Sequence, residues 1–188
     1  MSKQTIKPHS QNKSMLILIT LLTILCAAPV FGYSSPSDQS LTTIIFIRHA
    51  EKKVEPDNPD PDLSPAGEAR AQEIAKMFGD TGVNAIYATQ FKRTQQTVKP
   101  LADKLGIPVT QVPAKNSAEV VKQIRAQHMG KVIFVAGHNN SVPEMIAALG
   151  GPKFPLIPET EFDNLYILTI DGEGKAKLIK LKYSATVK

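Results

Sequence analysis

The chain has 188 residues, a formal net charge of +5 and a sequence pI of about 9.3. This length suits one ordinary domain, and a hydrophobic fraction of 42% excludes a chain that is disordered throughout. A basic pI raises the question of a nucleic-acid or acidic membrane partner, so the position of the positive charge decides what the value means.

Residues 1–32 have the pattern of a secretory signal peptide. Three lysines, Lys3, Lys7 and Lys13, precede an uncharged run of 17 residues that covers 15–31. Because 17 residues are at the lower limit for spanning a bilayer, an uncleaved membrane anchor is the alternative interpretation. The pattern predicts an exported domain, periplasmic or secreted, with membrane contact only through this segment if it is not cleaved.

The rest of the chain has little excess charge. Removing residues 1–32 takes away the three lysines and leaves 156 residues with a charge of +2. It also takes away Cys26, the only cysteine. We therefore expect no nucleic-acid partner, no disulfide and no thiol chemistry in the exported domain.

The first predicted elements follow a serine-rich linker over 33–41, so that the expected domain covers 42–188. Residues 42–47 form a short β-branched apolar run, which is typical of a strand buried on both faces. Residues 53–63 contain three prolines and four acids and predict a loop.

A regular alternation of helices and strands follows this loop. Ser64 and Pro65 are typical of a helix start, and Gly79 is expected to end the helix. Later in the chain the patterns predict strands over 84–88, 107–112, 131–136, 164–169 and 175–182, and helices over 92–105 (with Pro100 as a kink or break), 117–128 and 141–149. The alternation predicts an α/β fold, a mostly parallel open sheet with helices on both faces.

Charged and nucleophilic side chains stand at the carboxyl ends of the predicted strands, where open parallel sheets bind ligands. Arg48 and His49 follow one strand, His138 follows another, and Arg93 lies in the first turn of the helix after a third. Arginine matches phosphate oxygens with its planar fork, and neutral imidazole is a nucleophile that can take a phosphoryl group. The set predicts cleavage of phosphate esters with no metal and no cofactor.

Four segments carry a family resemblance. Residues 48–51 (RHAE) resemble the RHG/RHA signature of the histidine phosphatase (phosphoglycerate mutase-like) superfamily. Residues 63–67 (LSPAG), 88–97 (ATQFKRTQQT) and 137–141 (GHNNS) are similar to the family's L-T-x-x-G, S-S-x-x-x-R-A-x-x-T and H-x-N-S segments, in the same order. The resemblance is to the small SixA-like type and implies a phosphoglycerate mutase-like fold.

The resemblance also implies roles for single residues. His49 would be the nucleophile that forms a covalent phosphohistidine, and Arg48, Arg93 and His138 would form the phosphate pocket. The implied activity is hydrolysis of phosphate monoesters or phosphohistidine, with a phosphorylated small molecule or a phosphoprotein as substrate. Asn140 and Ser141 would order the loop at His138.

The sequence departs from the family pattern in its acids. Many relatives carry an acid between the second arginine and the second histidine, or directly after that histidine, to protonate the leaving group. Here Asn139 follows His138, and the nearest acid, Glu119, lies in the first turn of a helix, where carboxylates are common because of the helix dipole. Without an acid we expect a preference for leaving groups that need little protonation, such as phosphohistidine, acyl or aryl phosphates.

Other interpretations stay open at this point. The same pocket suits phosphoglycerate mutase-type phosphotransfer, or a non-enzymatic phosphate-binding domain. A metal site of Glu51 with the two histidines is disfavoured because the arginines would repel a cation. Arg70 and Arg125 are expected on helix surfaces, and specificity is expected from the loops 53–63 and 150–162.

Overall fold

The computed structural model describes residues 40–184. The signal segment predicted over 1–32 and nearly all of the predicted linker over 33–41 lie outside the described residues. Within 40–184 no helix combines the length and the hydropathy that a membrane crossing requires.

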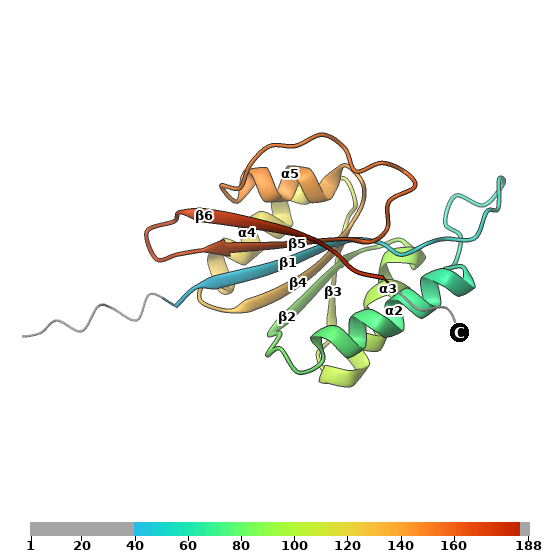
Figure 1. The fold of residues 1–188 in the computed structure, drawn as a ribbon, viewed down its shortest axis with the longest axis horizontal. Helices are drawn as coiled ribbons and strands as arrows, with labels where there is room; N and C mark the ends of the chain where they lie inside the picture. The colour runs from blue at the N-terminus through green and yellow to red at the C-terminus, as the bar shows by residue number, and fades with distance from the viewer. Residues whose placement is uncertain (1–39, 185–188) are drawn as a thin grey trace, which may run out of the picture. The chain divides into compact units, whose positions relative to one another are not determined.

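One six-stranded sheet runs through the domain, in the order β3-β2-β4-β1-β5-β6 (Figure 1). The strands β3, β2, β4 and β1 are mutually parallel, whereas β5 is antiparallel to β1 and β6 is antiparallel to β5. Their bounds are Thr42–Arg48 for β1, Ala85–Thr89 for β2, Val109–Val112 for β3, Val132–Gly137 for β4, Asn164–Ile170 for β5 and Ala176–Lys182 for β6. The predicted mostly parallel sheet is confirmed.

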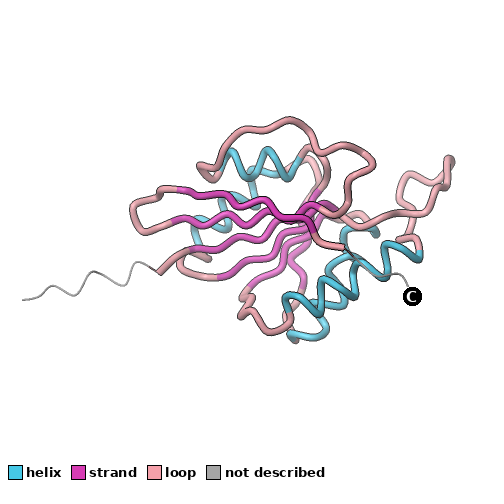
Figure 2. Tube along the Cα trace, viewed as in Figure 1, coloured by secondary structure: helices cyan, strands magenta, loops and turns pink. Residues whose placement is uncertain are grey.

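Helices cover both faces of this sheet, as Figure 2 shows. The helices α2 and α3 pack together on one face, and α4 and α5 pack together on the other. The bounds are Pro65–Phe78 for α2, Lys92–Leu105 for α3, Ser117–Gln127 for α4 and Ser141–Ala148 for α5. The α/β architecture predicted from the sequence is therefore confirmed.

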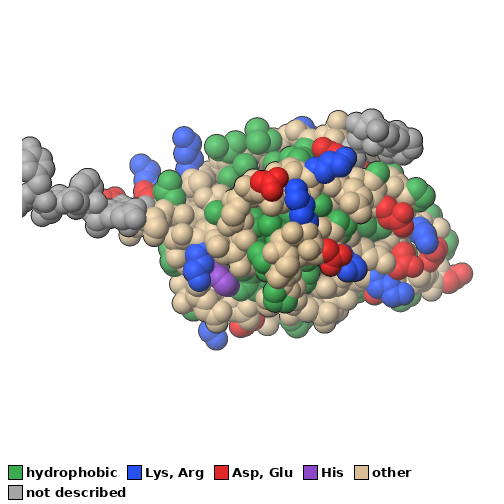
Figure 3. All heavy atoms as spheres, turned by 90° about the horizontal axis from the view of Figure 1, so that it is seen from below, with side chains coloured by type: hydrophobic (Ala, Val, Ile, Leu, Met, Phe, Trp, Pro, Cys, Tyr) green, Lys and Arg blue, Asp and Glu red, His purple; other side chains and the backbone are tan. Residues whose placement is uncertain are grey.

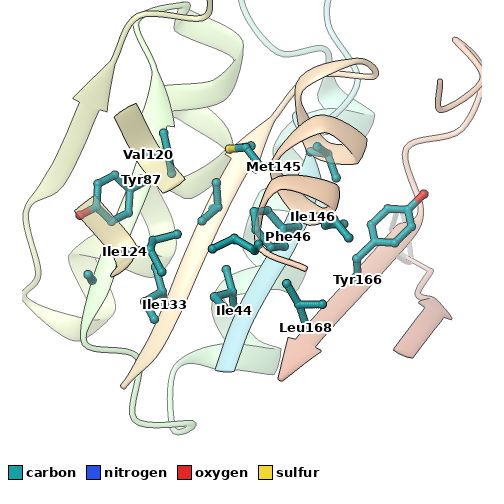
Figure 4. Close-up of a cluster of buried hydrophobic side chains, with 14 of the residues drawn as sticks. Ile44, Phe46, Tyr87, Val120, Ile124, Ile133, Met145, Ile146, Tyr166 and Leu168 are labelled. Carbon is teal, nitrogen blue, oxygen red and sulfur yellow. The ribbon is translucent and has the colours of Figure 1, made fainter. Parts of the chain in front are cut away.

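Strand β1 is held from both sides because its side chains alternate between two hydrophobic clusters. Ile44 and Phe46 belong to the cluster under α4 and α5, which Figure 4 shows, and Ile45 and Ile47 belong to the cluster under α2 and α3. All four are at most 4% exposed. Burying each contributes about 1.5–3 kcal/mol, so β1 is a rigid base for the residues that follow it.

Two local predictions need correction. Helix α3 continues through Pro100, so the expected break does not occur. Arg70 is not a free surface side chain, because its Nε and Nη2 donate to the Glu51 carboxylate at 2.8 and 2.6 Å and its guanidinium lies 5.2 Å from the Tyr183 ring centre. This bidentate ion pair joins α2 to the segment that follows His49.

The carboxyl ends of β1, β2 and β4 point to the same side of the domain. In Figure 1 the segment after β1 and the segment after α5 both pass on that side. Figure 3 views the molecule from below, where acidic and basic side chains are interspersed and neither sign forms a continuous patch.

Candidate active site

The two predicted histidines meet because β1 and β4 are neighbours in register. Arg48 pairs with Gly137 at the end of the parallel ladder, and the backbone N–H of His49 donates to the Gly137 carbonyl at 2.9 Å. His138 follows at once, and the ring centres of His49 and His138 lie 5.4 Å apart. Two residues 89 positions apart in the sequence thus share one pocket, as the strand-end argument predicts.

The backbone around His49 determines which ring nitrogen is free. Its Nδ1 lies 2.8 Å from the Ala50 carbonyl oxygen, and since a carbonyl only accepts, Nδ1 carries the proton and Nε2 keeps the lone pair. The pKa of His49 is lowered to about 3, chiefly by burial and also by the nearby His138, Arg48 and Arg93, which together outweigh the opposite effect of the Ala50 hydrogen bond. At neutral pH this imidazole is uncharged and nucleophilic.

His138 is held by groups from β2 and α5. Its Nε2 is 3.0 Å from the Thr89 hydroxyl, and its backbone N–H donates to Ser141 Oγ at 2.9 Å. The predicted ordering role of Ser141 is therefore seen directly, whereas the Asn140 side chain makes no capping hydrogen bond to α5. Burial lowers the pKa of His138 to about 4, and Arg93 and Arg48 contribute to the same shift.

Arg48 is buried at the end of β1 and contacts the segment between α5 and β5. Its Nη1 donates to the carbonyl oxygens of Pro158 and Glu159, each at 2.9 Å, and its Nη2 lies 2.5 Å from the Glu159 carboxylate. The Arg48 Nε is buried without a hydrogen-bond partner among residues 40–184. A buried N–H without an acceptor lowers the stability of the fold. An anion in the pocket would accept a hydrogen bond from it.

Arg93 approaches from the first turn of α3. Its guanidinium carbon lies 4.2 Å from the Phe91 ring centre and its Nη1 is 3.6 Å from Asp60. Asp60 also accepts from the Lys92 backbone N–H at 2.9 Å, so one carboxylate of the acidic loop steadies the start of α3. The Arg93 Nε, like that of Arg48, is buried without a partner in the described part of the chain.

All four predicted site residues line one pocket of about 380 Å³. The same pocket is lined by Lys52, Lys115 and Glu159, which the sequence reasoning missed. Four cationic side chains against one carboxylate make an anion site, and the planar fork of the two guanidinium groups matches the oxygens of a phosphate.

The other predicted candidates lie elsewhere. Glu119 does not line this pocket, and its carboxylate accepts from the Gln123 side chain at 2.9 Å within α4. Glu51 gives both oxygens to Arg70, so they are not directed at the histidines. Among residues 40–184 no three His, Cys, Asp or Glu side chains gather in a way that would hold a metal ion.

Arg93→Lys tests the contribution of the guanidinium fork. A lysine keeps the charge but loses the planar pair of donors, so we expect kcat/KM for a phosphate ester to fall by about 10²-fold. Arg125→Lys is the matched control, because Arg125 lies on α4 and donates only to the Ala148 carbonyl. The measurement is kcat/KM of the two variants from steady-state kinetics. Similar kcat/KM values for both variants would contradict a phosphate contact by Arg93.

Acid is expected to destabilise the domain through the two histidines. Both pKa values lie below the ordinary histidine value of 6.5, so the unfolded chain takes up protons first as the pH falls. The stability from the neutral rings is complete above pH 6.5 and is lost from there down to about pH 4 for His138 and about pH 3 for His49.

Urea unfolding at pH 6.5 and pH 4.5 measures this loss. We expect the parent protein to lose about 4 kcal/mol more than a His49→Asn/His138→Asn double variant over that interval, about 2 kcal/mol for each ring. The double variant corrects for carboxylates that titrate in the same range. An equal loss in both proteins would mean that the rings are not held neutral by the fold.

An α/β domain with a pocket of arginines and a neutral histidine at its strand ends fits a family of phosphate-handling proteins. Residues 44–116 match the model of the histidine phosphatase superfamily (branch 1). This match contains three of the four segments that carry the resemblance, while the His138 segment lies beyond it. No curated protein sequence matches the chain.

Several solved structures of phosphatases have a similar fold. The protein histidine phosphatase SixA complexed with tungstate has a TM-score of 0.62 at 17% sequence identity, covering 74% of this chain and 96% of that one. The mycobacterial glucosyl-3-phosphoglycerate phosphatase with inorganic phosphate has a TM-score of 0.62 at 15% identity, covering 78% and 99%. At such identities the likeness concerns the fold. Together with the family model it confirms the resemblance to the histidine phosphatase superfamily.

Proposed function

We propose that this protein is a phosphatase that hydrolyses phosphate monoesters or phosphohistidine through a covalent phosphohistidine on His49. The proposal depends chiefly on the state of the His49 ring. The ring is neutral, and its Nδ1 donates a hydrogen bond to the Ala50 carbonyl, which leaves Nε2 free as the nucleophile. A site that only binds phosphate has no need of a free nucleophilic nitrogen between two arginines. The match to the histidine phosphatase model supports the same class of reaction.

The reaction has two steps in this site. In the first, the lone pair of His49 Nε2 attacks phosphorus, the bond from phosphorus to the leaving group breaks, and the leaving group departs with that electron pair and takes a proton from an acid or from solvent where it needs one. In the second, water attacks the phosphohistidine, the P–N bond breaks, and its electrons return to Nε2 as inorganic phosphate forms. Arg48 and Arg93 would neutralise charge on the equatorial oxygens during both transfers, and the neutral His138 would donate a hydrogen bond to them.

The donors that line the pocket support hydrolysis without a metal. Guanidinium groups offer positive charge and hydrogen-bond donors to the phosphate oxygens, and the positive charge around the histidines opposes the binding of a metal cation. The proposed substrate is a phosphorylated small molecule or a phosphoprotein. Among the similar structures, one is called a protein histidine phosphatase and another a glucosyl-3-phosphoglycerate phosphatase, so both substrate classes occur on this fold.

The direct experiment is to trap the phosphoenzyme. The protein is incubated with an aryl phosphate in the presence of EDTA, quenched in base, and digested to locate the phosphate. We expect base-stable, acid-labile phosphate on His49 together with release of inorganic phosphate. Absence of both phosphoenzyme and turnover would favour a phosphate-binding domain, and transfer to an added alcohol in place of hydrolysis would favour a mutase.

A further inference from the structure

One carboxylate lines the pocket among the residues that the structure describes. Glu159 lies on the segment between α5 and β5, where its Oε2 is 2.5 Å from Arg48 Nη2 and its Oε1 accepts from the Asn139 side chain at 2.7 Å. Asn139 follows His138 directly and has an amide side chain. Its contact with Glu159 places a carboxylate next to this position, although the sequence has no acid there.

The backbone of this segment is anchored on both sides of the pocket. Arg48 at the end of β1 donates to the carbonyls of Pro158 and Glu159, and the Ile157 N–H donates to the Asn139 carbonyl at 3.0 Å beyond β4. The Glu159 side chain is nevertheless 75% exposed. The backbone of Glu159 is therefore fixed while its carboxylate is open to solvent. In this position the carboxylate can contact the leaving group of a phosphate ester whose phosphate lies in the pocket.

We propose that Glu159 is the catalytic acid that protonates the leaving group, an inference that rests on the proposed phosphatase function. As His49 Nε2 forms its bond to phosphorus and the P–O bond breaks, the Glu159 carboxyl gives its proton to the departing oxygen, which leaves as an alcohol. The resulting carboxylate then takes a proton from the water that attacks the phosphohistidine. One turnover thus returns both His49 and Glu159 to their starting forms.

Phosphate binding itself prepares Glu159 for this role. A phosphate in the pocket competes with the Glu159 carboxylate for Arg48 Nη2, the only cationic group within hydrogen-bond distance of Glu159 among residues 40–184. Once Arg48 donates to the phosphate, the Glu159 carboxyl group is released from its ion pair and can approach the departing oxygen. Asn139 remains as the neutral partner that orients the carboxyl group.

Glu159→Gln tests the proposal, because glutamine has the same shape and keeps an oxygen acceptor for Arg48. The measurement is kcat/KM, which reports the steps up to leaving-group release, for an alkyl phosphate and for p-nitrophenyl phosphate across the pH range. We expect the variant to lose about 10²–10³-fold with the alkyl ester and less than about tenfold with the aryl ester, whose leaving group needs little protonation.

Glu119→Gln is the matched control, since Glu119 is an acid of the same type outside the pocket, and we expect its profiles to equal those of the parent protein. Equal losses of the Glu159→Gln variant on both esters would overturn the proposal and leave Glu159 as a brace for Arg48. An effect of Glu119→Gln confined to the alkyl ester would overturn it in favour of Glu119. Lack of turnover in the parent protein would contradict the proposed function itself, which is a separate result.

Discussion

The His49→Ala variant is expected to form no phosphoenzyme and to lose turnover of an aryl phosphate by about 10⁴-fold or more. The physical reason is that the first step needs the lone pair of His49 Nε2, which the Ala50 hydrogen bond and the buried, neutral ring keep available. His138 is not expected to take over this role, since its Nε2 is engaged with the Thr89 hydroxyl.

Two measurements separate loss of the nucleophile from loss of the site. Titration calorimetry with inorganic phosphate is expected to show affinity within about tenfold of the parent protein, because the guanidinium groups that bind the anion remain. His128→Asn is the matched histidine control, because His128 lies at the end of α4 with its Nε2 on the Tyr87 hydroxyl. Acid-labile phosphate on the His49→Ala protein would contradict the assignment of the nucleophile.

The Gly67→Ala variant is expected to lose about 2–3 kcal/mol of folding stability and about 5–10 °C in Tm. A Cβ atom at Gly67 would lie 2.1 Å from the backbone oxygen of Glu51, which no rotamer change can move. That oxygen already accepts from the Ser64 N–H at 2.9 Å, so the start of α2 is packed directly on the segment that follows His49. Relief of the collision shifts this segment, and we expect kcat/KM to fall as well.

Urea unfolding gives the stability difference, and Gly79→Ala is the control within the same structural unit. At Gly79 the backbone is helical, and a Cβ atom would meet only the end of the Lys104 side chain, which can move away. We expect its cost to stay below about 1 kcal/mol. Equal effects of the two substitutions would show that the loss reflects general glycine replacement and not the contact between α2 and Glu51.

Glu159 changes how the leaving-group preference is to be tested. The sequence predicts a preference for phosphohistidine, acyl or aryl phosphates because it shows no acid at the usual positions. If Glu159 protonates the leaving group, that preference belongs to the Glu159→Gln variant, and the parent protein accepts alkyl esters too. The comparison of aryl and alkyl esters therefore distinguishes a site without an acid from one whose acid comes from a distant segment.

Local signals located most of the elements. The start of α2 was predicted from Ser64 and Pro65, and Ser64 Oγ does accept from the Gly67 N–H at 3.2 Å. The strand expected over 107–112 is shorter in the structure because the Ile107 N–H donates to the Ala102 carbonyl and completes the end of α3. The side-chain pattern alone does not show that the backbone N–H of Ile107 donates to the end of a helix and not to a neighbouring strand.

The sequence by itself determined the sheet-and-helix order and brought Arg48, His49, Arg93 and His138 to one rim, because parallel strands place their carboxyl ends together. Only the tertiary structure decided which nitrogen of His49 is free, that Arg70 pairs with Glu51, and that Glu159 reaches the pocket. Glu159 is 111 positions from Arg48 in a segment without helix or strand, and no periodic pattern marks it. Its place depends on hydrogen bonds from Arg48 to backbone carbonyls, which any sequence can supply and which only the folded chain brings into range.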